Sequence, residues 1–106
     1  ARKQEIVCRV LDEMRPLGIS YHRPRGGGYI WCALPQGIDS KEFSNAAYKR
    51  GLALLPGYVF YPHKNGGRGH IRINYSFETE ERLEKGLEIL RETLETELER
   101  QLAHKK

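Results

Sequence analysis

Apolar residues along this chain follow two different periods, one typical of helices and the other of strands. Helical spacing recurs in residues 2–15, in residues 40–50 and after Thr79. Asp39 and Thr79 stand where the N-caps of the second and third helices are expected. The third helix is predicted to bury a row of leucines along one side: Leu83, Leu87, Leu90, Leu94 and Leu98. A short chain that carries both periods is restricted to a small domain of mixed helices and strands.

Strand signals fill the gaps between these helices, at residues 19–22, 29–34, 52–55 and 70–75. The resulting order is helix, strand, strand, helix, strand, strand, helix, with no internal repeat and no linker-like segment. Residues 1–106 are therefore expected to form a single α+β domain. We predict a two-layer sandwich in which helices cover one face of a small, mostly antiparallel sheet. The other face of the sheet then needs an explanation.

Size and charge limit the classes of function. The chain has 106 residues, enough for one domain with a modest core. No apolar run approaches the roughly 20 residues that cross a bilayer, so we expect no association with a membrane. The net charge of +4 is unevenly spread, because residues 1–75 carry +7 and residues 76–106 carry −3. A basic face attracts nucleic acid, phosphate or carboxylate ligands, although at this size it is more often only a solvated surface.

The cysteines and histidines do not form a metal-binding pattern. Cys8 and Cys32 are 24 residues apart without a C-x-x-C motif, and the four histidines lack the spacing of a zinc site. We therefore expect two buried thiols in a reducing, cytoplasmic compartment, and neither a disulfide nor a metal site.

Arg72 is the most informative single residue. Its neighbours Ile71 and Ile73 are expected to point into the core, so strand alternation aims Arg72, together with Asn74, at the opposite face. A planar guanidinium matches a carboxylate or phosphate in a bidentate pair, and aromatic side chains at Trp31, Tyr58 or Phe60 would partly desolvate it. The alternative is an arginine that is paired with a structural acid or is simply solvated.

Other chemistry receives less support. No pair of carboxylates is placed for acid–base catalysis, and no serine or cysteine stands in a nucleophile motif. The run Gly26–Gly28 opens a strand rather than a helix, and no Gly-Lys-Ser/Thr follows it, which argues against a phosphate-binding loop. Residues 25–31 partly match an RNA-binding strand motif, so a small basic RNA-binding α+β module remains an alternative.

An ordered set of motifs resembles the C-terminal small domain of class I/II aminotransferases, which are fold-type I enzymes. The set comprises Gly27-Gly28-Tyr29-Ile30-Trp31, Leu34-Pro35, Gly51, Leu55-Pro56-Gly57, Phe60, Arg72-Ile73-Asn74-Tyr75 and a final amphipathic helix. The resemblance implies that Arg72 binds the substrate α-carboxylate, with Asn74, Pro56, Gly57 and Phe60 as further residues of the pocket. It also implies that the domain is excised from a longer aminotransferase-like protein.

The same resemblance implies a cofactor and partners outside this chain. Pyridoxal 5′-phosphate (PLP) would be bound by a large domain of the full-length parent, which would supply the Schiff-base lysine, and no catalytic or cofactor-binding residue is expected in this chain. The ligand would be an amino acid or a 2-oxo acid, and the parent would be a homodimer. Two parents stay open: an amino-acid transaminase, and a MocR-type regulator of the GntR family that binds DNA through a separate N-terminal domain.

Overall fold

A computed structural model describes residues 2–23, 28–56, 68–75 and 79–104, and every statement below concerns these residues. Their elements, in chain order, are α1 (Arg2–Met14), the short 3₁₀ helix η1 (Arg15–Leu17), β1 (Ser20–Tyr21), β2 (Tyr29–Ala33), α2 (Ser40–Lys49), β3 (Leu55–Pro56), β4 (His70–Asn74) and α3 (Glu80–His104). This order confirms the predicted alternation of helices and strands.

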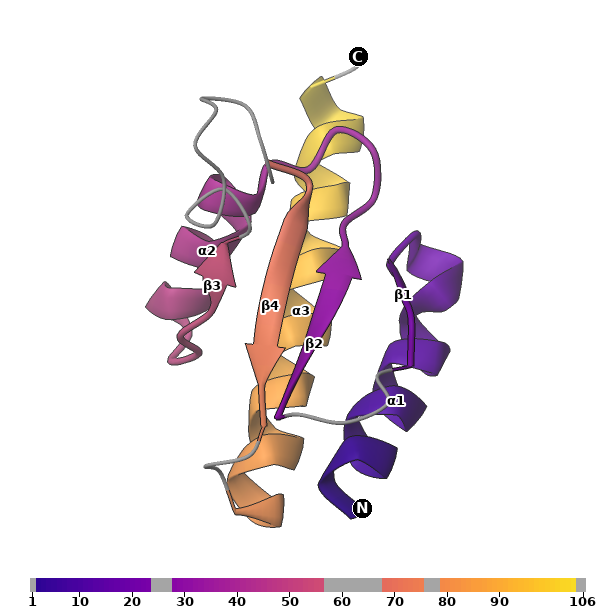
Figure 1. The fold of residues 1–106 in the computed structure, drawn as a ribbon. Coiled ribbons are helices and arrows are strands. Elements are labelled where there is room, and N and C mark those ends of the chain that lie inside the picture. The colour runs from indigo at the N-terminus through magenta and orange to yellow at the C-terminus, as the bar shows by residue number, and fades with distance from the viewer. Residues whose placement is uncertain (1, 24–27, 57–67, 76–78, 105–106) are drawn as a thin grey trace.

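The described strands form one sheet in the order β1-β2-β4-β3, and all of its pairings are antiparallel. In the central pair, Trp31 of β2 lies opposite Arg72 of β4, and Tyr29 lies opposite Asn74. Figure 1 shows the three helices on one side of the sheet, with α3 behind the central strands, α1 beside β1 and α2 beside β3. The predicted two-layer α+β sandwich is therefore confirmed.

The core lies between the sheet and the helices, and alternation along the strands decides which residues enter it. Ile30 and Cys32 of β2 and Ile71 of β4 are almost fully buried. The opposite layer contributes the predicted row of α3 leucines, of which Leu83, Leu87, Leu90 and Leu94 are buried while Leu98 is partly buried. Apolar side chains at every second position of the strands therefore pack against the apolar row of the helix, and this removes both sets from water.

Both predicted N-caps are present. The Asp39 side chain accepts hydrogen bonds from the backbone N–H groups of Lys41, at 3.0 Å, and Glu42, at 3.1 Å. The Thr79 hydroxyl oxygen accepts a hydrogen bond from the backbone N–H of Arg82 at 3.1 Å. Each cap satisfies donors that the first turn of a helix would otherwise leave without a partner.

The strand predicted at residues 52–55 is wrong for most of its length, because only Leu55 and Pro56 pair with β4. Gly51 adopts a φ of +99°, and the N–H of Leu52 donates back to the carbonyl oxygen of Ala47 at 2.9 Å. This is a Schellman-type helix end. The chain leaving α2 therefore packs Leu52 and Leu54 against the core before it reaches the sheet.

The strand predicted at residues 19–22 is also shorter in the structure, where β1 is limited to Ser20 and Tyr21. Cys8 and Cys32 are buried free thiols, as expected. Among the described residues, no group of three or more potential ligands is arranged to hold a metal ion. Within the same ranges, no helix is long and apolar enough to cross a membrane.

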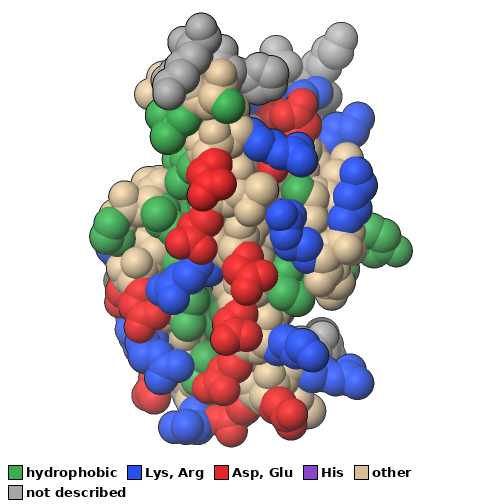
Figure 2. All heavy atoms as spheres, turned by 180° about the vertical axis from the view of Figure 1, so that it is seen from behind, with side chains coloured by type: hydrophobic (Ala, Val, Ile, Leu, Met, Phe, Trp, Pro, Cys, Tyr) green, Lys and Arg blue, Asp and Glu red, His purple; other side chains and the backbone are tan. Residues whose placement is uncertain are grey.

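The charge asymmetry of the sequence has a structural counterpart. Figure 2, which views the molecule from behind, shows acidic side chains running down α3 with basic side chains on both sides. Ion pairs join α1 to α3: Arg2 with Glu80, Arg9 with Glu84 at 3.9 Å, and Glu13 with Arg91 at 2.9 Å. The acidic C-terminal part of the chain thus lies on the helix layer, away from the open face of the sheet.

Candidate functional site

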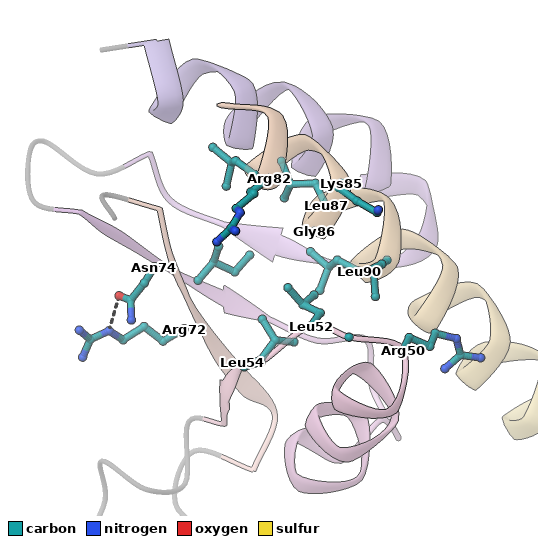
Figure 3. A pocket seen from close by; sticks show the side chains of 15 residues that line it. Arg50, Leu52, Leu54, Arg72, Asn74, Arg82, Lys85, Gly86, Leu87 and Leu90 are labelled. Atoms are coloured by element: carbon teal, nitrogen blue, oxygen red, sulfur yellow. Dashed lines mark hydrogen bonds between the residues drawn. The ribbon is translucent and has the colours of Figure 1, made fainter. Parts of the chain in front are cut away.

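The open face of the sheet is centred on Arg72. This residue stands in the middle of β4 between Ile71 and Ile73, which are 0% and 6% exposed, so its own side chain projects away from the helices. Figure 3 shows Arg72 and Asn74 on one side of β4 and the leucines of the core on the other. The prediction that alternation aims Arg72 and Asn74 at the face opposite the helix layer is confirmed.

Two neighbouring side chains contact the Arg72 guanidinium from different directions. Its Nε donates a hydrogen bond to Asn74 Oδ1 at 3.3 Å. Its Cζ lies 4.2 Å from the centroid of the Tyr29 ring, which is a cation–π distance. Asn74 is on the same strand, whereas Tyr29 belongs to β2 and is the diagonal neighbour of Arg72 across the pair. Asn74 thus binds the guanidinium along one edge, and the Tyr29 ring covers one of its faces.

Two aromatic residues of β2, Tyr29 and Trp31, lie next to Arg72 across the strand pair. Trp31, directly opposite Arg72, is half-buried, and Tyr29 is 40% exposed. Partial exclusion of water by such rings strengthens an ion pair between the arginine and a carboxylate, because screening weakens as the local dielectric constant falls. The face is therefore suited to binding a small anion with a planar acidic group.

The remaining predicted pocket residues are only partly placed. Pro56 lies in β3, where it pairs with Ile71, so its backbone is one register position away from Arg72. Gly57 and Phe60, and the aromatic candidate Tyr58, lie outside the described residues. The structure therefore brings Arg72 and Asn74 together and places the backbone of Pro56 beside them.

Sequence reasoning missed the contact of Tyr29 with Arg72. Alternation along β2 puts Tyr29 and Trp31 on the same face of the strand. Tyr29 lies over the guanidinium because β2 pairs with β4 in this register. An alternating pattern of apolar residues does not specify which strand is the neighbour.

The described residues do not fit a PLP site. The lysines among them are Lys3 of α1, Lys41 and Lys49 of α2, and Lys85 of α3, and all of these helices lie in the layer behind the sheet. Because the aldehyde of PLP is held by a lysine amine, a site beside Arg72 would need a lysine from elsewhere.

A second polar cluster has a structural role. The Tyr21 hydroxyl lies 2.8 Å from Asp12 Oδ1 and 3.2 Å from the carbonyl oxygen of Cys8, and Arg15 stacks over the Tyr21 ring. The hydrogen bond from Tyr21, with a second from Arg15, lowers the pKa of Asp12. Burial raises the pKa of Tyr21. This cluster links β1 to α1.

A hollow lies at the β3 edge of the sheet, between α3 and the segment that leaves α2. Its volume is about 760 Å³, and Leu52, Leu54 and Leu87 line it beneath a rim that includes Arg82. The Arg72 side chain reaches its margin but points away from its apolar floor (Figure 3). Arg72 and Asn74 also line this hollow, while the Arg72 side chain extends away from the leucines (Figure 3).

Comparison with characterised proteins identifies the class. No family model matches the chain. It is 31% identical over 98 residues to aromatic-amino-acid aminotransferase 1 of Thermococcus litoralis, covering 92% of this chain and 23% of that protein. It is 28% identical over 85 residues to the 2-aminoadipate transaminase of Thermus thermophilus, covering 80% of this chain and 21% of that protein.

A transcriptional regulator is also among the relatives. The chain is 26% identical over 98 residues to the uncharacterised HTH-type regulator YdcR of Escherichia coli, covering 92% of this chain and 21% of that protein. The chain therefore spans roughly a quarter of the length of the relatives that it matches.

Solved structures agree in fold. The kynurenine aminotransferase of Pyrococcus horikoshii aligns with a TM-score of 0.83 and 35% identity over 92% of this chain and 24% of that one. A multiple substrate aminotransferase of Thermococcus profundus aligns with a TM-score of 0.84 and 30% identity over 93% of this chain and 24% of that one. The fold and these relatives define a domain of the PLP-dependent aminotransferases. More particularly, the chain belongs to the fold-type I family and corresponds to its C-terminal small domain.

Proposed function

We propose that this domain recognises the α-carboxylate of an amino acid or 2-oxo acid through Arg72, within a longer protein whose large domain binds PLP. The observation that carries the proposal is the position of Arg72. It is a strand arginine with its two neighbours buried and its guanidinium held on the open face by Asn74 and Tyr29. A bidentate pair with a carboxylate uses this planar fork.

The chemical contribution of the domain is orientation. Binding the carboxylate to a guanidinium on a rigid strand fixes the direction in which the rest of the ligand points, and this removes rotational freedom before any reaction. Tyr29 and Trp31 limit access of water to the pair. In the family the cofactor acts as an electron sink for chemistry at the α-carbon, and in the parent it would be held by the large domain.

The parent protein remains one of two kinds. The aminotransferase relatives support a transaminase, whereas the match to YdcR supports a regulator in which a MocR-type domain of this fold senses the ligand. In either case the expected partner of the open sheet face is the large domain of the same chain, and the parent is expected to be a homodimer. We do not propose the RNA-binding alternative, because the relatives described above are aminotransferases and a transcriptional regulator.

The test is the Arg72→Ala variant of the intact parent. Removing one partner of a desolvated charge pair costs about 2 to 5 kcal/mol, so affinity for the amino acid or 2-oxo acid should fall by at least thirtyfold. Arg72→Lys should recover only part of the affinity, because an ammonium keeps the charge but loses the planar fork. Titration calorimetry of the holoprotein measures both effects.

Arg9→Ala is the matched control, since Arg9 is an exposed arginine on the helix layer. It should leave the ligand affinity unchanged. Equal affinities for the wild-type protein and Arg72→Ala would remove Arg72 from the binding site. Transamination by the intact parent would favour the enzyme, and ligand-dependent DNA binding without transamination would favour the regulator.

A further inference from the structure

We infer that Tyr29 is the positioning residue for Arg72, and that its ring, not its hydroxyl group, prepares the guanidinium for a carboxylate. The inference rests on the proposed function of Arg72 and adds a residue that acts through it. Tyr29 precedes Arg72 by 43 residues in the sequence, and the two meet because β2 and β4 pair.

The contacts of Tyr29 and Asn74 restrain the guanidinium in different ways. The Tyr29 ring, 4.2 Å from Cζ, covers one face of the group and so restricts the tilt of its plane. The hydrogen bond to Asn74, 3.3 Å from Nε, restricts rotation within that plane. Together they limit both the tilt and the in-plane rotation of the planar group that a carboxylate would pair with.

The backbone that carries the ring lies in paired strands. Tyr29 is the first residue of β2 and lies opposite Asn74, and the ladder continues beyond it through a bond of 2.8 Å from the N–H of Tyr75 to the carbonyl oxygen of Gly28. A restraint that is mounted on paired strands exists before the ligand arrives. The ligand then does not have to bear the entropic cost of ordering a long side chain.

The size of the effect follows from that cost. Immobilising one rotamer-rich side chain on binding corresponds to about a twofold to twelvefold change in affinity. Tyr29→Leu removes the aromatic face and keeps an apolar side chain of similar bulk, so carboxylate affinity should fall by this factor. Tyr29→Phe keeps the ring and should bind within about twofold of the wild type.

The experiment measures affinity of the intact holoprotein for 2-oxoglutarate by calorimetry, in the wild type, Tyr29→Phe, Tyr29→Leu and Arg72→Ala. Tyr48→Leu is the matched control, because Tyr48 is a tyrosine on α2 that is 72% exposed. A loss in Tyr29→Leu that Tyr29→Phe and Tyr48→Leu do not share supports the inference. Should Tyr29→Leu fail to fold, Tyr29→Met removes the ring with a more adaptable side chain.

Failure of the inference and failure of the proposed function give different results. If Arg72→Ala binds 2-oxoglutarate with wild-type affinity, the carboxylate site is elsewhere, and both the proposed function and the role of Tyr29 are refuted. If Arg72→Ala loses affinity while Tyr29→Leu does not, only the role of Tyr29 falls. If Tyr29→Phe loses as much affinity as Tyr29→Leu, the hydroxyl group is responsible and the ring-stacking argument is overturned.

A readout independent of any ligand uses this 106-residue chain. In a ¹⁵N-labelled sample, the Nε–Hε resonance of Arg72 is identified by its loss in Arg72→Lys. Because the guanidinium lies over an aromatic face, this proton resonance should lie upfield of the exposed arginines and return toward them in Tyr29→Leu but not in Tyr29→Phe. An unchanged resonance in Tyr29→Leu would show that the ring does not hold the guanidinium.

Discussion

Two glycines with nearly the same φ angle should respond very differently to substitution by alanine. Gly18, at the end of η1, has a φ of +105°, and Gly51, after α2, has a φ of +99°. A Cβ added at Gly18 would lie 2.9 Å from Cβ and 3.0 Å from Cγ of Pro35. A Cβ added at Gly51 would meet nothing within 4 Å in the described structure. Comparing Gly18→Ala with Gly51→Ala therefore distinguishes the cost of backbone strain from the cost of a steric clash.

The magnitudes follow from these two terms. An L-residue in the left-handed region costs about 1 to 2 kcal/mol, which is the whole penalty expected for Gly51→Ala. Gly18→Ala adds overpacking against a proline ring, which costs about 1 to 3 kcal/mol more. The midpoint of thermal unfolding should fall by about 4 to 8 °C for each kcal/mol in a domain of this size.

Urea and thermal unfolding, followed by circular dichroism, measure both variants under the same conditions. The Pro35 contact is the cause only if Pro35→Gly, which removes the ring and its Cβ, recovers part of the loss in the Gly18→Ala background. Equal destabilisation by Gly18→Ala and Gly51→Ala would refute the steric argument. It would mean that the segment after β2 moves freely away from the start of β1.

Two further predictions concern stability. Asp39→Ala should lower the free energy of unfolding by about 1 to 2 kcal/mol in urea titrations, because it removes the α2 cap and the ion pair with Arg68, whereas Asp39→Asn should keep the cap and lose less. Burial, and then the proximity of Cys8, raise the pKa of Cys32 to about 12. The unfolded thiol ionises near its ordinary pKa and the folded one does not, so the free energy of unfolding should fall as pH rises from about 8.5 toward 12, by about 1 to 2 kcal/mol at pH 10. The slope should flatten in Cys32→Ala, and an unchanged slope would assign the alkaline loss to other groups.

Local sequence patterns were sufficient for much of this domain. The face on which Arg72 lies follows from Ile71 and Ile73, since two buried neighbours on one strand leave the residue between them only the other side. The caps at Asp39 and Thr79 follow from the chemistry of a helix start. These features depend on residues a few positions apart, and such short-range relations are preserved in every compact arrangement of the chain.

Contacts between distant segments could not be predicted in the same way. The departure of residues 52–54 from the sheet depended on the helix end at Gly51 and on a place for Leu52 against the core. The stacking of Tyr29 on Arg72 depended on which strands became neighbours and in what register. Alternation indicates the face of each side chain but not the partner across the sheet, because pairing is decided by how all the elements pack together. Composition and periodicity thus define the layers and the face on which the arginine lies, whereas the stacking of Tyr29 on this arginine arises only when β2 and β4 are paired.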